Sequence, residues 1–176
     1  LIASVVFLAT AYRFDNRFVL SLALSTLAGY LGLTIGFDTL ESDPLRIAGF
    51  LYGAFLLGAG VVSKQIAIKP HFLDVYLQLG ANALLLAAMS GTIGSSADWE
   101  YLLLLLMLSA AAIALGIHFK RFAFVAYGVV FGYAGLSIRL IDGMNDAMPV
   151  LLYFIVTASL VAFALVRVAR RFGRDA

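Results

Sequence analysis

The sequence predicts an all-α fold, a polytopic bundle of transmembrane helices. Hydrophobic residues make up 63% of the chain, 12% are charged, and the mean hydropathy is +1.02, whereas a soluble domain carries about twice that share of charge. The charges are clustered, and the apolar runs between them have roughly the 17 to 22 residues that a helix needs to cross a bilayer. Leu, Ala and Gly dominate these runs without strand-like alternation, which favours helices over a barrel.

Six complete spans and one truncated first span are predicted. Residues 1–12 would cover only about 18 Å as a helix, and the chain opens on Leu1 inside an apolar run, so we expect the start of this span and further N-terminal sequence to lie upstream. The complete spans are expected at 18–37, 45–63, 72–93, 99–117, 122–141 and 149–166. Short connections make consecutive helices antiparallel neighbours, so 1–176 is predicted to form a single transmembrane domain.

Residues typical of helix starts support several of these boundaries. Asp43 precedes Pro44, a cap followed by proline at the first helical position, and Ser95 with Asp98 resembles a capping box. Pro70 and Pro149 also stand at span entrances. The prolines therefore mark helix starts and not kinks in the middle of the membrane.

Basic residues predict the orientation. Ten of the 12 basic residues fall on one side: Arg13, Arg17, Lys64, Lys69, Lys120, Arg121, Arg167, Arg170, Arg171 and Arg174. This side is expected to be cytoplasmic, as is the C-terminus. The last four arginines follow the final span and are expected to anchor it to anionic lipid headgroups; docking of a cytoplasmic partner is the alternative.

An internal repeat is predicted from two similar stretches. Arg17–Ile35 and Arg121–Ile138 both begin with Arg-Phe and both contain Gly-Tyr-x-Gly-Leu-[Ser/Thr]-Ile. The two stretches align when a gap of one residue is allowed. The offset of about 104 residues relates spans of the same direction, which indicates a parallel repeat with units 1–93 and 99–176. Convergence at membrane helix ends is the alternative.

Glycines in these and one further span recur every three or four residues. They are Gly29, Gly32, Gly36, Gly49, Gly53, Gly128, Gly132 and Gly135. Small residues let helix backbones approach closely in lipid. We expect them to form packing seams, and a pathway lined by glycine is the alternative.

The fourth span carries a polar stripe. His71, Asp74, Gln78 and Asn82 share one helical face. Counted along the helix axis from Pro70, Asn82 lies about 18 Å into the membrane, near the midplane. Polar groups at that depth face the bundle or water. The stripe is a candidate pathway for a cation or polar solute. The alternative is ordinary interhelical hydrogen bonding, with Asp74 close enough to the surface to pair with Lys69 or with lipid amines.

Arg139 is a second candidate: we expect it to snorkel to headgroups or to form an ion pair with Asp142 or Glu100 on the acidic side, and a gate or an anion contact is the alternative. Trp99 and Tyr101 on that side fit an aromatic belt. The chain has no cysteine and two histidines, and the common hydrolase, nucleotide and metalloprotease motifs are absent. We therefore expect no catalytic, cofactor or metal site, no enzymatic activity and no binding of nucleic acid.

The Tyr12–Phe18 turn, the paired Gly-Tyr-x-Gly-Leu blocks and the run of short-looped helices resemble predicted bacterial membrane proteins of a domain-of-unknown-function family. The resemblance implies a bacterial cytoplasmic membrane and supplies no ligand. Two functions remain open: a structural or sensory module of a larger membrane protein, acting as a homo-oligomer or with an upstream cytoplasmic domain, and a transporter or channel-like module.

Overall fold

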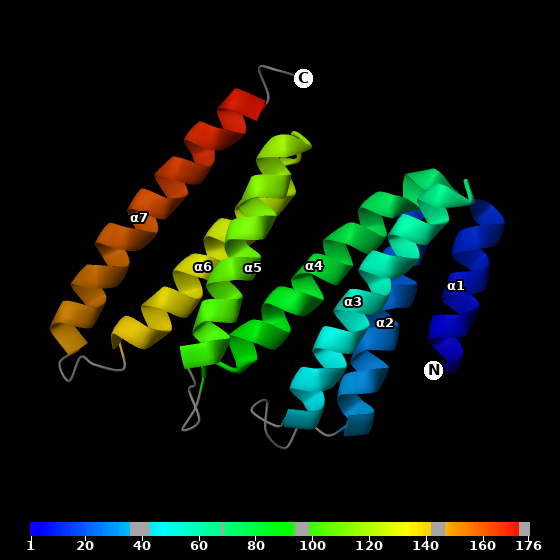
Figure 1. Cartoon of the computed structure of the whole chain (residues 1–176), viewed down its shortest axis with the longest axis horizontal. Helices are drawn as coiled ribbons and strands as arrows, with labels where there is room; N and C mark the ends of the chain where they lie inside the picture. The colour runs from blue at the N-terminus through cyan, green and yellow to red at the C-terminus, as the bar shows by residue number, and fades with distance from the viewer. Residues whose placement is uncertain (36–42, 68, 94–98, 142–146, 173–176) are drawn as a thin grey trace. The chain divides into compact units, whose positions relative to one another are not determined.

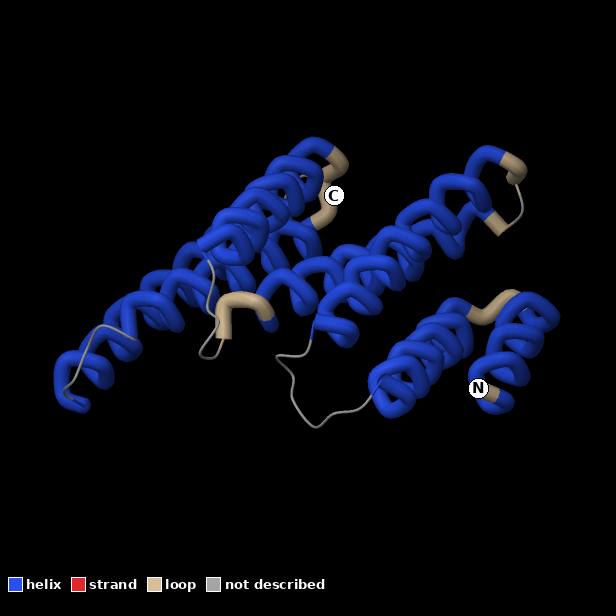
Figure 2. The backbone as a smooth tube through the Cα atoms, turned by 60° about the horizontal axis from the view of Figure 1, so that its bottom comes forward, coloured by secondary structure: helices blue, strands red, loops and turns tan. Residues whose placement is uncertain are grey.

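The computed structural model describes residues 1–35, 43–67, 69–93, 99–141 and 147–172. Every regular element in these residues is a helix (Figures 1 and 2). The helices are α1 (Ile2–Phe14), α2 (Arg17–Ile35), α3 (Asp43–Gln65), the short 3-10 helix η1 (Pro70–Phe72), α4 (Leu73–Ser90), α5 (Trp99–His118), α6 (Phe122–Ile141) and α7 (Ala147–Phe172). The predicted all-α fold is confirmed.

Six segments of these helices are long and apolar enough to cross a membrane. They are Arg17–Thr34, Asp43–Gln65, Pro70–Ser90, Trp99–His118, Phe122–Ile141 and Met148–Phe172. Each corresponds to one of the complete spans predicted from the sequence, and α1, with 13 residues, is shorter. The clearest boundary difference is at α7, which continues to Phe172 instead of ending at 166 and so carries the first C-terminal arginines on helical turns.

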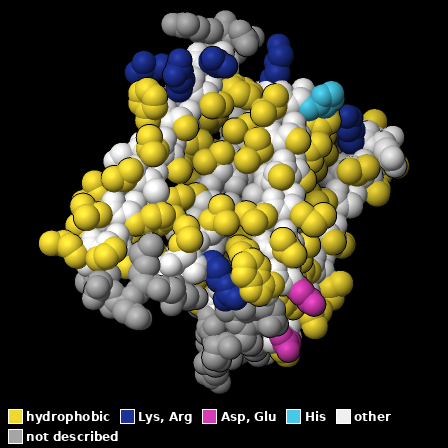
Figure 3. Space-filling model, turned by 60° about the vertical axis from the view of Figure 1, so that its left-hand side comes forward, with side chains coloured by type: hydrophobic (Ala, Val, Ile, Leu, Met, Phe, Trp, Pro, Cys, Tyr) yellow, Lys and Arg dark blue, Asp and Glu magenta, His cyan; other side chains and the backbone are white. Residues whose placement is uncertain are grey.

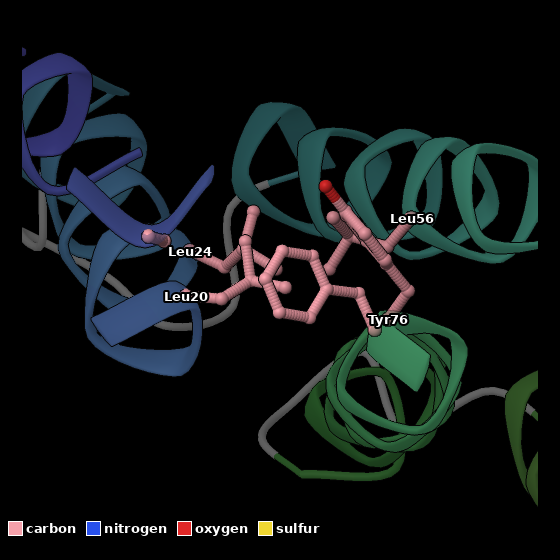
Figure 4. Packing of buried hydrophobic residues seen from close by; sticks show 6 residues of the cluster. Leu20, Leu24, Leu56 and Tyr76 are labelled. Atoms are coloured by element: carbon pink, nitrogen blue, oxygen red, sulfur yellow. The ribbon is translucent and has the colours of Figure 1, made fainter. Parts of the chain in front are cut away.

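The helices form two compact units, Leu1–Ser90 and Gly91–Ala176. In the first unit α1 pairs with α2 and α3 pairs with α4, and α2 also packs against α3 and α4. Figure 4 shows Leu20 and Leu24 of α2 pointing toward Leu56 of α3 and Tyr76 of α4. Lipid provides little hydrophobic drive for helices to associate, so the attraction has to come from close packing of side chains. The packing of these four residues therefore holds the two hairpins together.

In the second unit α5 pairs with α6, and α7 packs against α6. Leu102, Leu105 and Ala112 of α5 and Val125 of α6 are buried. None of the α7 span is buried within the protein. Hydrophobic side chains cover most of the face drawn in Figure 3, as expected where the outer surface of a bundle contacts lipid tails.

The α1–α2 and α5–α6 turns share one backbone geometry. Asp15 (φ 56°) and Lys120 (φ 54°) are left-handed. The residue after each donates its amide to a carbonyl five positions earlier, Asn16 to Ala11 at 3.1 Å and Arg121 to Gly116 at 2.8 Å. These are helix ends of the Schellman type, made here without glycine.

Candidate functional site

The polar stripe predicted for the fourth span is divided by the structure. His71 lies in η1, whereas Asp74, Gln78 and Asn82 lie in α4, which begins at Leu73. All four side chains are half-buried. Because η1 is wound more tightly than an α-helix, His71 does not continue the α4 face, and its imidazole contacts the α1–α2 turn.

Asn82, the deepest member of the stripe, hydrogen-bonds within its own helix. Its Nδ2 donates to the backbone carbonyl of Gln78 at 2.9 Å. A polar side chain in the membrane interior is costly unless it finds a partner, and this bond satisfies part of that requirement locally. The amide therefore has one donor fewer to offer to a passing solute.

An ion cluster joins the two hairpins of the first unit at one end. Asp15 Oδ1 lies 2.7 Å from Lys69 Nζ and 2.9 Å from His71 Nε2. The hydrogen bond from Lys69 is the main cause that lowers the pKa of Asp15 below its ordinary value of 3.8; the charge of His71 acts in the same direction and partial desolvation opposes it. Lys69 thus pairs with Asp15, where the sequence had suggested Asp74.

Sequence reasoning missed Asp15 as a member of this cluster. The available signal was that Asp15 and Lys69 have opposite charges and fall in two turns on the same predicted side of the membrane. The spacing of residues along one helix carries no information about pairs between turns, so it predicts the stripe at His71 and Asp74 but not the pair of Asp15 with Lys69.

Tyrosine hydroxyl groups take part in several polar contacts between helices, which the sequence did not predict. In the first unit, Tyr12 and Tyr76 hydroxyls lie 3.0 Å apart, and Tyr52 donates to the Leu24 carbonyl at 2.7 Å. In the second, hydroxyls of α6 and α7 pair as Tyr133 with Thr157 at 2.8 Å and as Ser137 with Tyr153 at 3.0 Å. Each unit therefore has its helices bonded across an interface inside the spans.

Five of the predicted packing glycines lie against a neighbouring helix. In α3, a Cβ atom added at Gly49 would lie 3.0 Å from Ala87 Cβ, and one at Gly53 would lie 2.9 Å from the Gly80 carbonyl oxygen. In α6, a Cβ at Gly128 would lie 2.5 Å from the Ser109 carbonyl oxygen and one at Gly132 would lie 3.3 Å from Ser109 Cβ. A Cβ at Gly135 would meet the Leu105 side chain. Gly60, Gly80 and Gly116, which we did not single out, are equally close-packed. These positions have no room for a side chain without a shift of the neighbour.

The first copy of the glycine block behaves differently. Gly29 is exposed, and a Cβ there would meet no described atom within 4 Å, which corrects its predicted role in a seam; Gly32 is buried, and Gly36 lies outside the described residues. The reason is register: the left-handed turn residues Asp15 and Lys120 are 105 positions apart, but Gly29 and Gly132 are 103 apart. Two residues turn a helix face by about 200°, so Gly29 lies on an exposed face of α2, whereas its counterpart Gly132 lies against Ser109 of α5.

Arg139 stacks on an aromatic ring at the acidic end of the second unit. Its Cζ lies 5.1 Å from the centroid of the Trp99 ring, a distance typical of cation–π contacts. Asp142, one of the two acidic partners predicted for it, lies outside the described residues. The contact joins the start of α5 to the end of α6 and places the cation with a side chain of the predicted aromatic belt.

The C-terminal arginines extend the other end of the second unit. Arg167, Arg170 and Arg171 are exposed on the last turns of α7, and Arg174 lies outside the described residues. The rings of Phe122 and Phe172 have centroids 6.2 Å apart. This contact holds the end of α7 beside the start of α6.

Among the described residues no group of three or more His, Cys, Asp or Glu side chains is arranged to hold a metal ion. Comparisons of the chain with protein-family models, with curated proteins and with solved structures find no match. The fold and the side-chain contacts therefore carry the functional argument.

Proposed function

We propose that this chain is a structural or sensory module of a membrane protein, a packed helical scaffold in which any signal passes through the packing of its helices. The bond from Asn82 to the Gln78 carbonyl carries the proposal, because a solute pathway along α4 needs its deepest polar group to be available. The close glycine contacts of α3 with α4 and of α5 with α6 support the same conclusion.

The proposed setting is a bacterial cytoplasmic membrane with the C-terminus in the cytoplasm. Support comes from the positive-inside rule applied to each unit. In the first, the contact of Asp15 with Lys69 brings the α1–α2 and α3–α4 turns, with their basic residues, to one end. In the second, the Phe122–Phe172 contact brings Lys120, Arg121 and the α7 arginines to one end.

We also propose that the two units descend from one duplicated unit. The matching geometry of the Asp15 and Lys120 turns supports this, in addition to the Gly-Tyr-x-Gly-Leu blocks. The module has no enzymatic activity in this proposal. Its partners are the lipid bilayer, a second copy of the chain or a cytoplasmic domain upstream.

A transporter or channel-like module is the second candidate, favoured by the half-buried Asp74, Gln78 and Asn82 on α4. Reconstitution into vesicles loaded with pH-, potassium- and chloride-sensitive dyes distinguishes the two. The scaffold predicts flux no greater than in vesicles without protein. Flux that is lost in the Asp74→Asn, Asn82→Leu double variant, while an Ala114→Leu variant on the exposed face of α5 retains it, would establish the transporter and overturn the scaffold.

A further inference from the structure

The two equivalent turns carry opposite charges. The left-handed residue is Asp15 in the first unit and Lys120 in the second. Asp15 is neutralised within its own unit by Lys69 and His71. Lys120 is exposed, and the only acidic residue among the described part of its unit is Glu100, which lies at the opposite end of α5.

The end of α7 adds three cations to this turn. Arg167, Arg170 and Arg171 are spaced by three and four residues, so they lie on neighbouring positions of one helical surface. The Phe122–Phe172 contact holds the end of α7 beside the start of α6, so these arginines lie at the same end of the unit as the α5–α6 turn. We call the combination of Lys120, Arg121, Arg167, Arg170 and Arg171 the basic end.

Exposed apolar side chains lie directly next to the basic end. Phe119, which precedes Lys120, is 62% exposed, and Phe163, one helical turn before Arg167, is 65% exposed. Cations beside apolar side chains at the end of a span fit the boundary between lipid headgroups and acyl chains.

We propose that the basic end is a binding site for an anionic phospholipid with two phosphates, such as diphosphatidylglycerol. One phosphate pairs with Lys120 and the other with the α7 arginines, whose guanidinium groups bind phosphate oxygens in pairs. The acyl chains lie along Phe119 and Phe163. This proposal rests on the membrane location given in the proposed function. It adds the class of lipid that is bound and a binding site formed by the α5–α6 turn and the end of α7.

Native mass spectrometry of the full chain in a non-ionic detergent tests the site by titration with diphosphatidylglycerol, phosphatidylglycerol and phosphatidylcholine. We expect diphosphatidylglycerol to be retained most strongly. Lys120→Gln and Arg171→Gln should each weaken its retention about fivefold, the effect of roughly one basic contact. Lys120→Arg should retain it, and the double variant should lose less than the product of the two single effects, because both residues hold one lipid.

Lys64→Gln is the matched control, since Lys64 is an exposed basic residue at a helix end of the other unit. Equal retention of the three lipids, or equal weakening by Lys64→Gln and Lys120→Gln, would overturn the site in favour of general attraction to positive charge. Competition by millimolar inorganic phosphate would overturn it in favour of a free phosphate. Flux in the vesicle experiment would remove the scaffold function and leave this site standing, so the two failures are distinguishable.

Discussion

Gly128 and Gly29 show how strongly the surroundings of a glycine determine its role. A Cβ at Gly128 would lie 2.5 Å from the Ser109 carbonyl oxygen, which is backbone and cannot move aside, whereas a Cβ at Gly29 would meet no described atom within 4 Å. Replacing an exposed helical glycine by alanine stabilises a helix by about 1 kcal/mol. Forcing an extra carbon into a packed interface costs about 1–3 kcal/mol.

We therefore predict that Gly128→Ala lowers the melting temperature of the detergent-solubilised protein, and that Gly29→Ala leaves it unchanged or raises it. A net loss of about 1 kcal/mol corresponds to about 2–4 °C. Gly58, which also has no described atom within 4 Å of its Cβ position, gives a second control through Gly58→Ala. Equal melting temperatures for Gly128→Ala and Gly29→Ala would contradict the α5–α6 seam.

Asp15 predicts a pH dependence. Its pKa in the folded protein lies below the ordinary value of 3.8, chiefly because of the bond from Lys69. The stabilisation is therefore fully present above pH 3.8 and is lost as the pH falls through the folded pKa. We predict that the wild-type melting temperature falls more steeply below this pH than that of Asp15→Asn.

Lys69→Gln removes the main cause of the shift and should flatten the pH profile as Asp15→Asn does. Lys64→Gln, which changes an exposed lysine of α3, should retain the wild-type profile. Identical acid profiles for the wild type and Asp15→Asn would show that the cluster does not couple the hairpins.

At the scale of one element, α7 is bonded to α6 by two hydroxyl pairs. No residue of its span is buried, and its polar contacts to α6 are Tyr133 with Thr157 and Ser137 with Tyr153. Such bonds contribute about 0.6 kcal/mol each in membranes. The Tyr133→Phe, Tyr153→Phe double variant should therefore open α7 about sevenfold more often.

Amide hydrogen exchange of α7 in detergent micelles measures this opening. We expect the increase in α7 and little change in α3, which packs within the other unit. Tyr30→Phe is the control, because Tyr30 is 39% exposed on α2. Unchanged exchange in α7 of the double variant would mean that apolar contacts alone hold this helix.

The helices themselves could be predicted from sequence because length and apolar composition are local properties. The six spans and the start of α3 at Asp43 and Pro44 follow from them. The continuation of α7 to Phe172 was missed, since arginines end a span without ending a helix. The direction of the Gly29 face was also missed, because two extra residues between the turn and the block rotate it, and only the turn geometry reveals the correct register.

The contacts between elements were the least accessible part of the candidate site. The stripe on α4 was read from one helix, and its individual residues are where a continuous helix would put them except at His71, where η1 intervenes. Asp15 with Lys69 and Tyr52 with the Leu24 carbonyl join residues from different hairpins. Such pairs depend on how helices pack, which periodicity along one helix does not encode.

For the whole molecule, the span order makes a prediction about sidedness that does not depend on how the two units are arranged. Lys64 lies at the end of α3 and Lys120 follows α5, so two spans separate them. The first span consists of η1 and α4, and the second is α5. An even number of crossings returns the chain to the same side. Glu100, at the start of α5, is one crossing from Lys120 and belongs on the other side.

The absence of cysteine from the chain makes this measurable with single substitutions. Lys64→Cys, Lys120→Cys and Glu100→Cys place thiols at exposed positions. In inside-out bacterial membrane vesicles, a maleimide that cannot cross the bilayer should label the first two, and in intact spheroplasts it should label the third. Labelling of Lys64→Cys and Lys120→Cys from opposite sides would mean that one of the intervening helices does not span the membrane. In that case α2 and α6 would run in opposite directions through the membrane, which would contradict a parallel repeat.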